Sequence, residues 1–344
     1  MLNRYVSNVL RAFVLMFVVG AFFPSTPFAL ETSPVGFTAQ RIAGTGGQFA
    51  RARTYLATPF QGRAVETGVI GRIDGATLHV QHSESSAEGE PEKPFQRSTY
   101  ADTHYLQITK GPRVGYHVGI VAGDAHTLQL SQDLSGLLKP GDAYRVRPYM
   151  TLFHVLGRHN ESASLHAAPA FDQADQIYIP EPQSGQLAAY YYRQQAEEAP
   201  VLAHRDGQPV EKAPILYPGS GFMISRIAED DARLMHSGDV QNHAAVIPVE
   251  TGVNFIASTF PVDTTLAELF GPRLGGLSEG DAVHLPREFD IQAPYRVVRS
   301  AGALRWLPLG DAPPAVQARI PVGSVVILQR RGGPFNLRLE RPFD

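Results

Sequence analysis

The sequence of 344 residues contains no cysteine. This absence excludes disulfide bonds, thiolate metal sites and cysteine nucleophiles, and it leaves no N-terminal cysteine to carry a lipid. Stability must therefore come from a packed core. Hydrophobic residues make up 43% of the chain and charged residues 18%, which is ordinary for a globular protein that buries such a core.

The sequence also lacks an excess of basic charge and the short motifs of several enzyme classes. The formal net charge is -3 at pH 7 and the sequence pI is about 6.5. Nucleic acid is therefore not expected as a partner, because proteins that bind it usually show a basic face. We find no H-E-x-x-H or P-loop motif. The sequence predicts no catalytic residues, no cofactor and no bound metal.

Long apolar runs are scarce, and the one that is present lies near the start. The block "AFVLMFVVGAFF" runs from Ala12 to Phe23. It follows Arg4 and Arg11 and precedes a more polar segment in which Ala29 is the expected cleavage position. This order is typical of a secretory signal, and the block is shorter than the roughly 20 residues of a membrane-spanning helix. We predict removal of residues 1–29, no transmembrane segment thereafter, and a periplasmic, outer-surface or extracellular location; an uncleaved anchor is the alternative.

Most of the periodic segments read as strands. The stretches "LHVQH", "TLQL" and "DAYRVRPY" alternate apolar and polar residues, and turn signals such as "DG" and "KPGD" separate them. Helical patterns are few: short turns at Thr151–Gly157 and Thr265–Gly271, and one further candidate at Ser225–Gly238. Closely spaced strands with such punctuation favour an all-β sandwich or barrel.

Five blocks of sequence recur in the same order along the chain. The spacing between partners is about 200 residues for the first block and about 105 for the last three. The pairs are Thr54–Phe60 with Asn254–Phe260, Thr151–Gly157 with Thr265–Gly271, Ala174–Pro180 with Gly280–Pro286, Ala189–Gln194 with Tyr295–Ser300, and Tyr217–Arg226 with Pro321–Arg330.

The change in spacing locates an insertion of about 90 residues between Phe60 and Thr151 in the first copy. The insert holds at least five strand-like segments, which are enough to close a small barrel. We therefore predict an all-β fold in which a sandwich-like or barrel-like unit is duplicated and the first copy carries an inserted small β-barrel. The predicted ranges are 30–60 with 151–239 for the first unit, 61–150 for the barrel, and 240–344 for the second unit.

Several of these segments carry a family resemblance. The run "THYLQITKGPRVGYHVGIVAGDAHTLQLSQDLSGLLKPGDAYRVRPYMTL", the block "STFPVDTTL", the strand "AAYYYRQ" and the glycine turn before "FMISR" resemble an uncharacterised family of exported β-rich repeat proteins typical of verrucomicrobial-type bacteria. The resemblance spans nearly the whole chain after residue 29. It implies export and a repeated β fold, and it implies no activity or catalytic residue. Members tend to carry a tryptophan before the final strand in both copies, whereas this chain has only Trp306.

Aromatic residues are the candidates for ligand binding. Tyr190, Tyr191 and Tyr192 occupy one predicted strand, so alternate rings face opposite sides. One face should then present tyrosine away from the core, where a ring can stack on a flat ligand such as a sugar. We take Tyr190, Tyr192 and Trp306 as candidate ligand-binding residues. The alternative is that tyrosine simply suits a half-buried strand.

Two other stretches look like sites at first sight. His236, Asp239 and His243 have the separations that one face of a helix would bring together, but the glycine and asparagine between them favour a solvated linker, so no metal is predicted. The stretch "YPGSGFMISR" offers a glycine turn, a hydroxyl and a cation. Strand-forming residues follow the turn, which argues against a phosphate cradle. We interpret Gly219 as a tight-turn glycine and Arg226 as a strand-end charge.

The functional expectation that results is an exported, non-catalytic protein with a structural or adhesive role at the cell envelope or outside the cell. Its partners would be polysaccharide or envelope proteins. The alternative is a carbohydrate-binding module that uses tyrosine and tryptophan surfaces. A third hypothesis is an uncharacterised glycan-active enzyme, which would need a pocket with two facing carboxylates.

Overall fold

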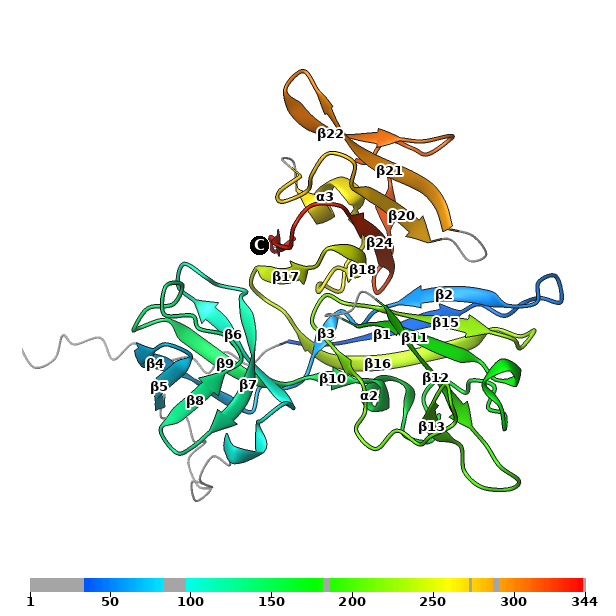
Figure 1. The fold of residues 1–344 in the computed structure, drawn as a ribbon, viewed down its shortest axis with the longest axis horizontal. Coiled ribbons are helices and arrows are strands. Elements are labelled where there is room, and N and C mark those ends of the chain that lie inside the picture. Colours follow the sequence, from blue (N-terminus) through cyan, green and yellow to red (C-terminus); the bar gives the residue numbers. More distant parts are fainter. Residues whose placement is uncertain (1–33, 83–96, 182–185, 272–273, 287–290, 343–344) are drawn as a thin grey trace, which may run out of the picture. The chain divides into compact units, whose positions relative to one another are not determined.

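The computed structural model describes residues 34–82, 97–181, 186–271, 274–286 and 291–342 (Figure 1). The apolar block Ala12–Phe23 and the expected cleavage position at Ala29 lie outside these residues. Strands dominate the described chain, as predicted, and its two α-helices have five residues each. No helix within the described ranges is long and apolar enough to cross a lipid bilayer.

The inserted segment forms a closed antiparallel barrel of six described strands, coloured from blue through cyan to green in Figure 1. Their order around the barrel is β4 (Glu66–Asp74), β5 (Thr77–His82), β8 (Thr127–Leu130), β7 (His117–Gly123), β6 (His104–Lys110) and β9 (Ala143–Pro148), after which β9 pairs with β4 again. Alternate residues of these strands, such as Tyr144 and Val146, point inward and form the barrel's own core. The predicted small barrel is confirmed.

A buried ion pair lies inside the barrel. Arg97 opens the short 3-10 helix η1 (Arg97–Thr99), and its guanidinium contacts Glu66 at 2.7 Å with both side chains fully buried. The hydroxyl of Tyr144 donates a further hydrogen bond to Glu66 at 2.7 Å. Two buried charges are tolerated when each is paired and hydrogen bonded in this way. The pair therefore ties η1 to the barrel wall.

The first repeat unit is built around a five-stranded sheet. Its strands, in spatial order, are β2 (Ala52–Leu56), β15 (Phe222–Arg226), β11 (Gln176–Pro180), β12 (Leu187–Arg193) and β13 (Val201–His204). The remaining elements are the ribbon β1 (Val35–Ile42), β16 (Ala232–Val240) and β3 (Phe60–Gln61), the short pair β10 (Met150–Thr151) and β14 (Ile215–Leu216), helix α2 (Leu152–Leu156) and the 3-10 helix η2 (Phe171–Gln173).

The second unit, in yellow to red in Figure 1, repeats the five-stranded sheet, the short strand pair and the short helix, and its ribbon has two strands. Its five-stranded sheet has the order β18 (Gly252–Ala257), β24 (Val325–Arg330), β20 (Ala282–Pro286), β21 (Ile291–Ser300) and β22 (Ala303–Pro308). Beside the sheet are the ribbon β17 (Ala245–Val249) with β25 (Phe335–Leu339), the short pair β19 (Thr264–Thr265) with β23 (Arg319–Ile320), and helix α3 (Leu266–Phe270).

The two sheets correspond strand for strand, so the predicted duplication is confirmed. The strand register also corrects one block of the repeat. Tyr190 pairs with Ile177, and Tyr295 pairs with Val283 at the matching place in the second sheet. Tyr190 therefore corresponds to Tyr295, one residue away from the match that the sequence suggests.

Both short helices form where the sequence predicts them. The hydroxyls of Thr151 and Thr265 cap their N-termini, and Gly157 and Gly271 follow their last residues with φ of 88° and 70°. The helix predicted at Ser225–Gly238 is wrong, because most of that stretch belongs to the two strands β15 and β16. In β16, every second residue from Ala232 to His236 is buried, which is the period of a strand.

Each unit contains one buried ion pair at the same structural position. Asp175 contacts Arg226 at 2.8 Å, and Asp281 pairs with Arg330 in the second unit. Each carboxylate also accepts a backbone hydrogen bond from the residue that follows its arginine. Arg226 is the last residue of β15, as interpreted from the sequence, and its buried side chain holds this strand end to Asp175 at the start of β11.

The two units contact each other through equivalent residues. The amide of Ala57 donates to the carbonyl of Gly323 at 2.7 Å, and the amide of Ala257 donates to the carbonyl of Gly219 at 2.9 Å. Such reciprocal contacts are the rule at a twofold interface between identical subunits. Gly219 and Gly323 have φ of 78° and 72°, as expected for turn glycines. The glycine turns of the repeat thus join the two units.

Gly221 directly follows this turn, and the second copy has a larger residue at the equivalent position. A Cβ atom at Gly221 would lie 2.2 Å from a methyl group of Val325, which is its own counterpart in the second unit. The rings of Tyr55 and Phe255, another equivalent pair, meet edge to face nearby, with centroids 5.6 Å apart. The small residue in one copy therefore leaves room for the larger residue in the other.

Candidate functional site

The tyrosine strand does not present a ring to solvent. The three side chains are almost fully buried: the solvent-exposed fractions of Tyr190, Tyr191 and Tyr192 are 9%, 2% and 0%. The expectation of an exposed tyrosine face is therefore wrong. The sheet is covered on both sides: Tyr190 and Tyr192 belong to the main core of the first unit, and Tyr191 packs against Phe171 of the connection that precedes β11. Burial raises the pKa of Tyr192, whose hydroxyl donates to the carbonyl of Gly157.

Trp306 lies in a different environment. It belongs to β22, is half-buried, and meets Phe270 of α3 edge to face, with ring centroids 5.5 Å apart. The strand register places it opposite Val297, where the first unit has Leu202 opposite Tyr192. Leu202 is only 2% exposed. The aromatic residue therefore occurs in the unit where this position borders open space.

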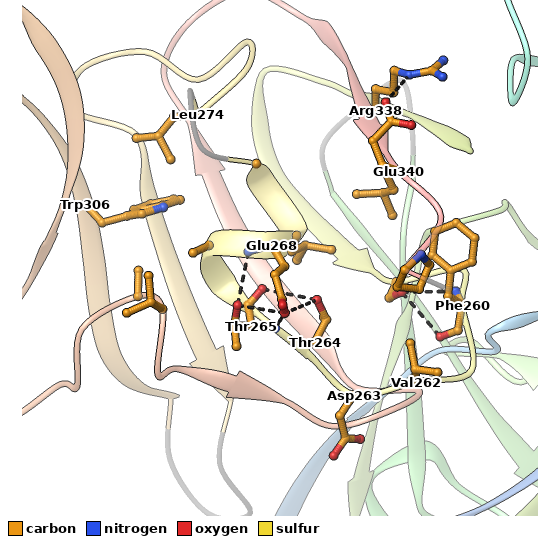
Figure 2. A pocket seen from close by; sticks show the side chains of 18 of the residues that line it. Phe260, Val262, Asp263, Thr264, Thr265, Glu268, Leu274, Trp306, Arg338 and Glu340 are labelled. Atoms are coloured by element: carbon orange, nitrogen blue, oxygen red, sulfur yellow. Dashed lines mark hydrogen bonds and ion pairs between the residues drawn. The ribbon is translucent and has the colours of Figure 1, made fainter. Parts of the chain in front are cut away.

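That space is a hollow of about 1150 Å³ in the second unit (Figure 2). Its walls come from the segment around α3, from β22 with the connection that follows it, and from the end of β25. About half of the lining residues are aliphatic or proline: Val262, Ala267, Leu269, Leu274, Leu304, Pro308, Pro314, Ala315, Val316, Leu339 and Pro342. Such a lining favours an occupant that brings apolar groups.

The wall formed by α3 is held rigidly. Thr265 and Glu268 form a capping box in which each side chain bonds the other's backbone amide. The hydrogen bonds from Thr265 lower the pKa of Glu268, so this carboxylate is charged at neutral pH. Leu274, on the same side of the hollow as Trp306 in Figure 2, has a φ of 50°, which is rare for a residue with a branched side chain.

Three carboxylates border the hollow, and each has its own partner. Glu268 caps α3, and Asp263 accepts a hydrogen bond from the amide of Val322 at 2.9 Å. Glu340 accepts one from Arg338 at 2.7 Å. Figure 2 shows these carboxylates on separate segments and directed to different neighbours. The pair of facing carboxylates that glycan cleavage requires is not assembled from them.

The histidine and aspartate side chains near residue 240 also have separate roles. Asp239 contacts Arg147 of the barrel strand β9 at 2.8 Å, while His236 is buried beside the ring of Phe60. Burial lowers the pKa of His236 to about 4. No group of three histidine or acidic side chains suited to a metal ion is present within the described part of the chain.

Comparison with known proteins gives no match: no protein-family model, no curated protein and no solved structure corresponds to this chain. Of the three predicted ligand-binding residues, Trp306 lines the hollow, whereas Tyr190 and Tyr192 lie in the core of the other unit.

Most of the lining carries no sequence signal. It comes from three stretches separated by more than twenty residues each, and about half of its members are ordinary aliphatic residues and prolines. Only Trp306 indicated the position of the hollow. It is the single tryptophan of the chain, and the first copy of the repeat has Leu202 at the equivalent position.

Proposed function

We propose that this is an exported, non-catalytic protein with a structural or adhesive role at the cell envelope or outside the cell, and that it holds its partner in the hollow beside Trp306. The observation that carries this proposal is the hollow itself, which is large, mainly apolar and bordered by carboxylates that already have partners. Such a site suits the holding of an apolar group more than the transfer of a proton.

The chain supplies its own reporter for this proposal, because Trp306 is its only tryptophan. Isolated envelope polysaccharide and envelope protein fractions are added to the chain spanning residues 30–344, and tryptophan emission is followed. Occupation of the hollow should shift the emission to shorter wavelength and protect the ring from acrylamide. Trp306→Leu, which copies Leu202 of the first unit, should weaken retention on the same material about tenfold.

Leu307→Ala is the matched control. Leu307 is 44% exposed and is the next residue of β22, so its side chain points to the opposite face of the strand. Its substitution should leave retention unchanged. Equal retention of the unaltered chain and Trp306→Leu, with no change in emission at saturation, would refute the role of the hollow.

The alternative function is carbohydrate binding, and it now rests on Trp306 alone. A sugar ring could stack on the indole while its hydroxyl groups reach Asp263 or Arg305 at the rim. A glycan array separates this alternative from the first proposal. Binding of soluble oligosaccharides that is lost in Trp306→Leu would favour the carbohydrate function, whereas binding retained in that variant would exclude it.

A further inference from the structure

The outer edge of strand β22 is uncovered. β22 is the last strand of its sheet, and no backbone hydrogen bond to its other side is made within the described residues. Its alternate residues Leu304, Trp306 and Pro308 line the hollow. An open edge next to an apolar hollow is a place where another strand can add, and proteins normally cover such edges.

The first unit shows how the equivalent edge is covered. After β13 the chain turns back, and residues 208–210 run antiparallel along the strand. The amide of His204 donates to the carbonyl of Gln208 at 2.8 Å, and the amide of Val210 donates to the carbonyl of Leu202 at 2.9 Å. The side chain of Val210 is 8% exposed and joins the same core as Leu202. One short extended segment thus fills both the edge and the space beside it.

The second unit does not cover β22 in this way. The carbonyl of Pro313 accepts the hydroxyl of Tyr295 at 2.8 Å, and that of Ala315 accepts the amide of Ala267 at 3.3 Å. The segment that returns after β22 is therefore held toward α3, away from the edge of β22.

The same chain exposes a strand with the pattern that such an edge would accept. β1 is the end strand of its ribbon. Its outward side chains Val35 and Phe37 are 74% and 82% exposed, and Met235 on the neighbouring strand β16 is 65% exposed. Large apolar side chains with this exposure form a patch whose contact with water is unfavourable, and such patches usually mark interaction sites.

We propose that strand β1 of one copy adds to the edge of β22 in a second copy, and that this seats Phe37 in the hollow beside Trp306. The inference deepens the proposed function, on which it rests, by naming the partner as another copy of the chain. Main-chain hydrogen bonds along β22 supply affinity, and the alternate side chains of β1 supply specificity.

This contact is heterologous, since the donor strand lies in the first unit and the acceptor edge in the second. However many copies join, the assembly keeps one free donor at one end and one free acceptor at the other, so it grows head to tail unless rotation closes it into a ring. A structural role outside the cell is consistent with such growth.

The test measures sedimentation of the chain spanning residues 30–344, which keeps every described residue. Its mean mass should increase with concentration. Phe37→Asp removes the donor side chain, and Val316→Asp places a charge in the hollow at a residue that is 66% exposed. Because both positions are exposed, both variants should fold. Each should raise the dissociation constant about tenfold or more.

Two further variants separate the effect of added charge from the effect of main-chain hydrogen bonding. Val121→Asp adds the same charge at a residue of barrel strand β7 that is 42% exposed, and it should assemble like the unaltered chain. Leu304→Pro removes an outward-facing N–H from β22, which an edge strand tolerates. It should weaken assembly, and undiminished assembly of this variant would overturn strand addition.

Mixing the variants tests the head-to-tail geometry. Phe37→Asp keeps an acceptor and Val316→Asp keeps a donor, so each alone should stay monomeric while the mixture should give a dimer that grows no further. A mixture that stays monomeric while the unaltered chain assembles would overturn the heterologous contact. So would a chain that is monomeric at all concentrations, and in that case a response of Trp306 to envelope material would still uphold the proposed function.

Discussion

His236 is packed against the ring of Phe60, with its side chain 8% exposed and neither ring nitrogen hydrogen bonded within the described chain. Burial removes water from the imidazole without offering it a counter-charge, so its pKa falls to about 4. The imidazole stays neutral near pH 7 and packs in the core like an apolar aromatic ring.

This lowered pKa makes stability depend on pH. Between pH 6.5 and about 4 the unfolded chain binds a proton at His236 and the folded chain does not, so the free energy of unfolding should fall as the pH drops through this window. The loss due to this residue is on the order of 3 kcal/mol at most. His236→Phe should show a correspondingly smaller loss in urea unfolding at pH 7 and pH 4. Equal losses in the two proteins would contradict the assignment.

At the scale of elements, the buried pairs Asp175–Arg226 and Asp281–Arg330 join the same two strands in each sheet. Asp281→Asn leaves Arg330 buried without a counter-charge and should lower the free energy of unfolding by about 3–5 kcal/mol. Asp175→Asn should have a similar effect on the first unit. Denaturant unfolding of the two variants measures both losses.

Glu279→Gln is the control for charge removal. Glu279 lies 3.7 Å from Arg299, and both side chains are more than half exposed. A surface pair of this kind contributes about 1 kcal/mol or less. If Asp281→Asn were no more destabilising than Glu279→Gln, the buried pairs would have no structural role.

The elements that the sequence predicted share a feature: their signal is local. The helices at residues 151 and 265 follow from a threonine cap and a glycine stop, and the barrel follows from strands interrupted by turns. Strand β16 was missed because its inward residues include His236 and Asp239, which a hydrophobic pattern counts as polar. The tyrosine strand was misjudged because its second face is covered by residues near Phe171, a contact that no local pattern reveals.

The candidate site was predictable in one residue only. Trp306 was visible as the chain's single tryptophan, but its hollow depends on segments that meet only after folding. The open edge of β22 was equally hidden, because its meaning comes from comparison with the covered edge of β13 in the other unit.

In the molecule as a whole, the contact between the two units should tolerate a large side chain at position 221 or at position 325, but not at both. Gly221→Val should destabilise the protein by about 1–3 kcal/mol through overpacking against Val325. Adding Val325→Gly should restore part of that loss, since it removes the opposing methyl groups. Thermal unfolding of the single and double variants measures this coupling.

Gly136→Val serves as the comparison, because no atom lies within 4 Å of the position that its Cβ would occupy. It should change stability by less than about 0.5 kcal/mol. Strictly additive effects of Gly221→Val and Val325→Gly would show that the two positions do not share one space.

The pair Gly221 and Val325 also bears on how the two halves of the chain can diverge. In a dimer of identical subunits, a residue near the symmetry axis faces a copy of itself, so any substitution there happens twice. Two valines would collide, and two glycines would leave a gap. Once both halves are encoded in one chain, each half changes independently, and a mismatched pair becomes a good fit. The same freedom allows one half to keep a closed sheet edge while the other leaves its edge open.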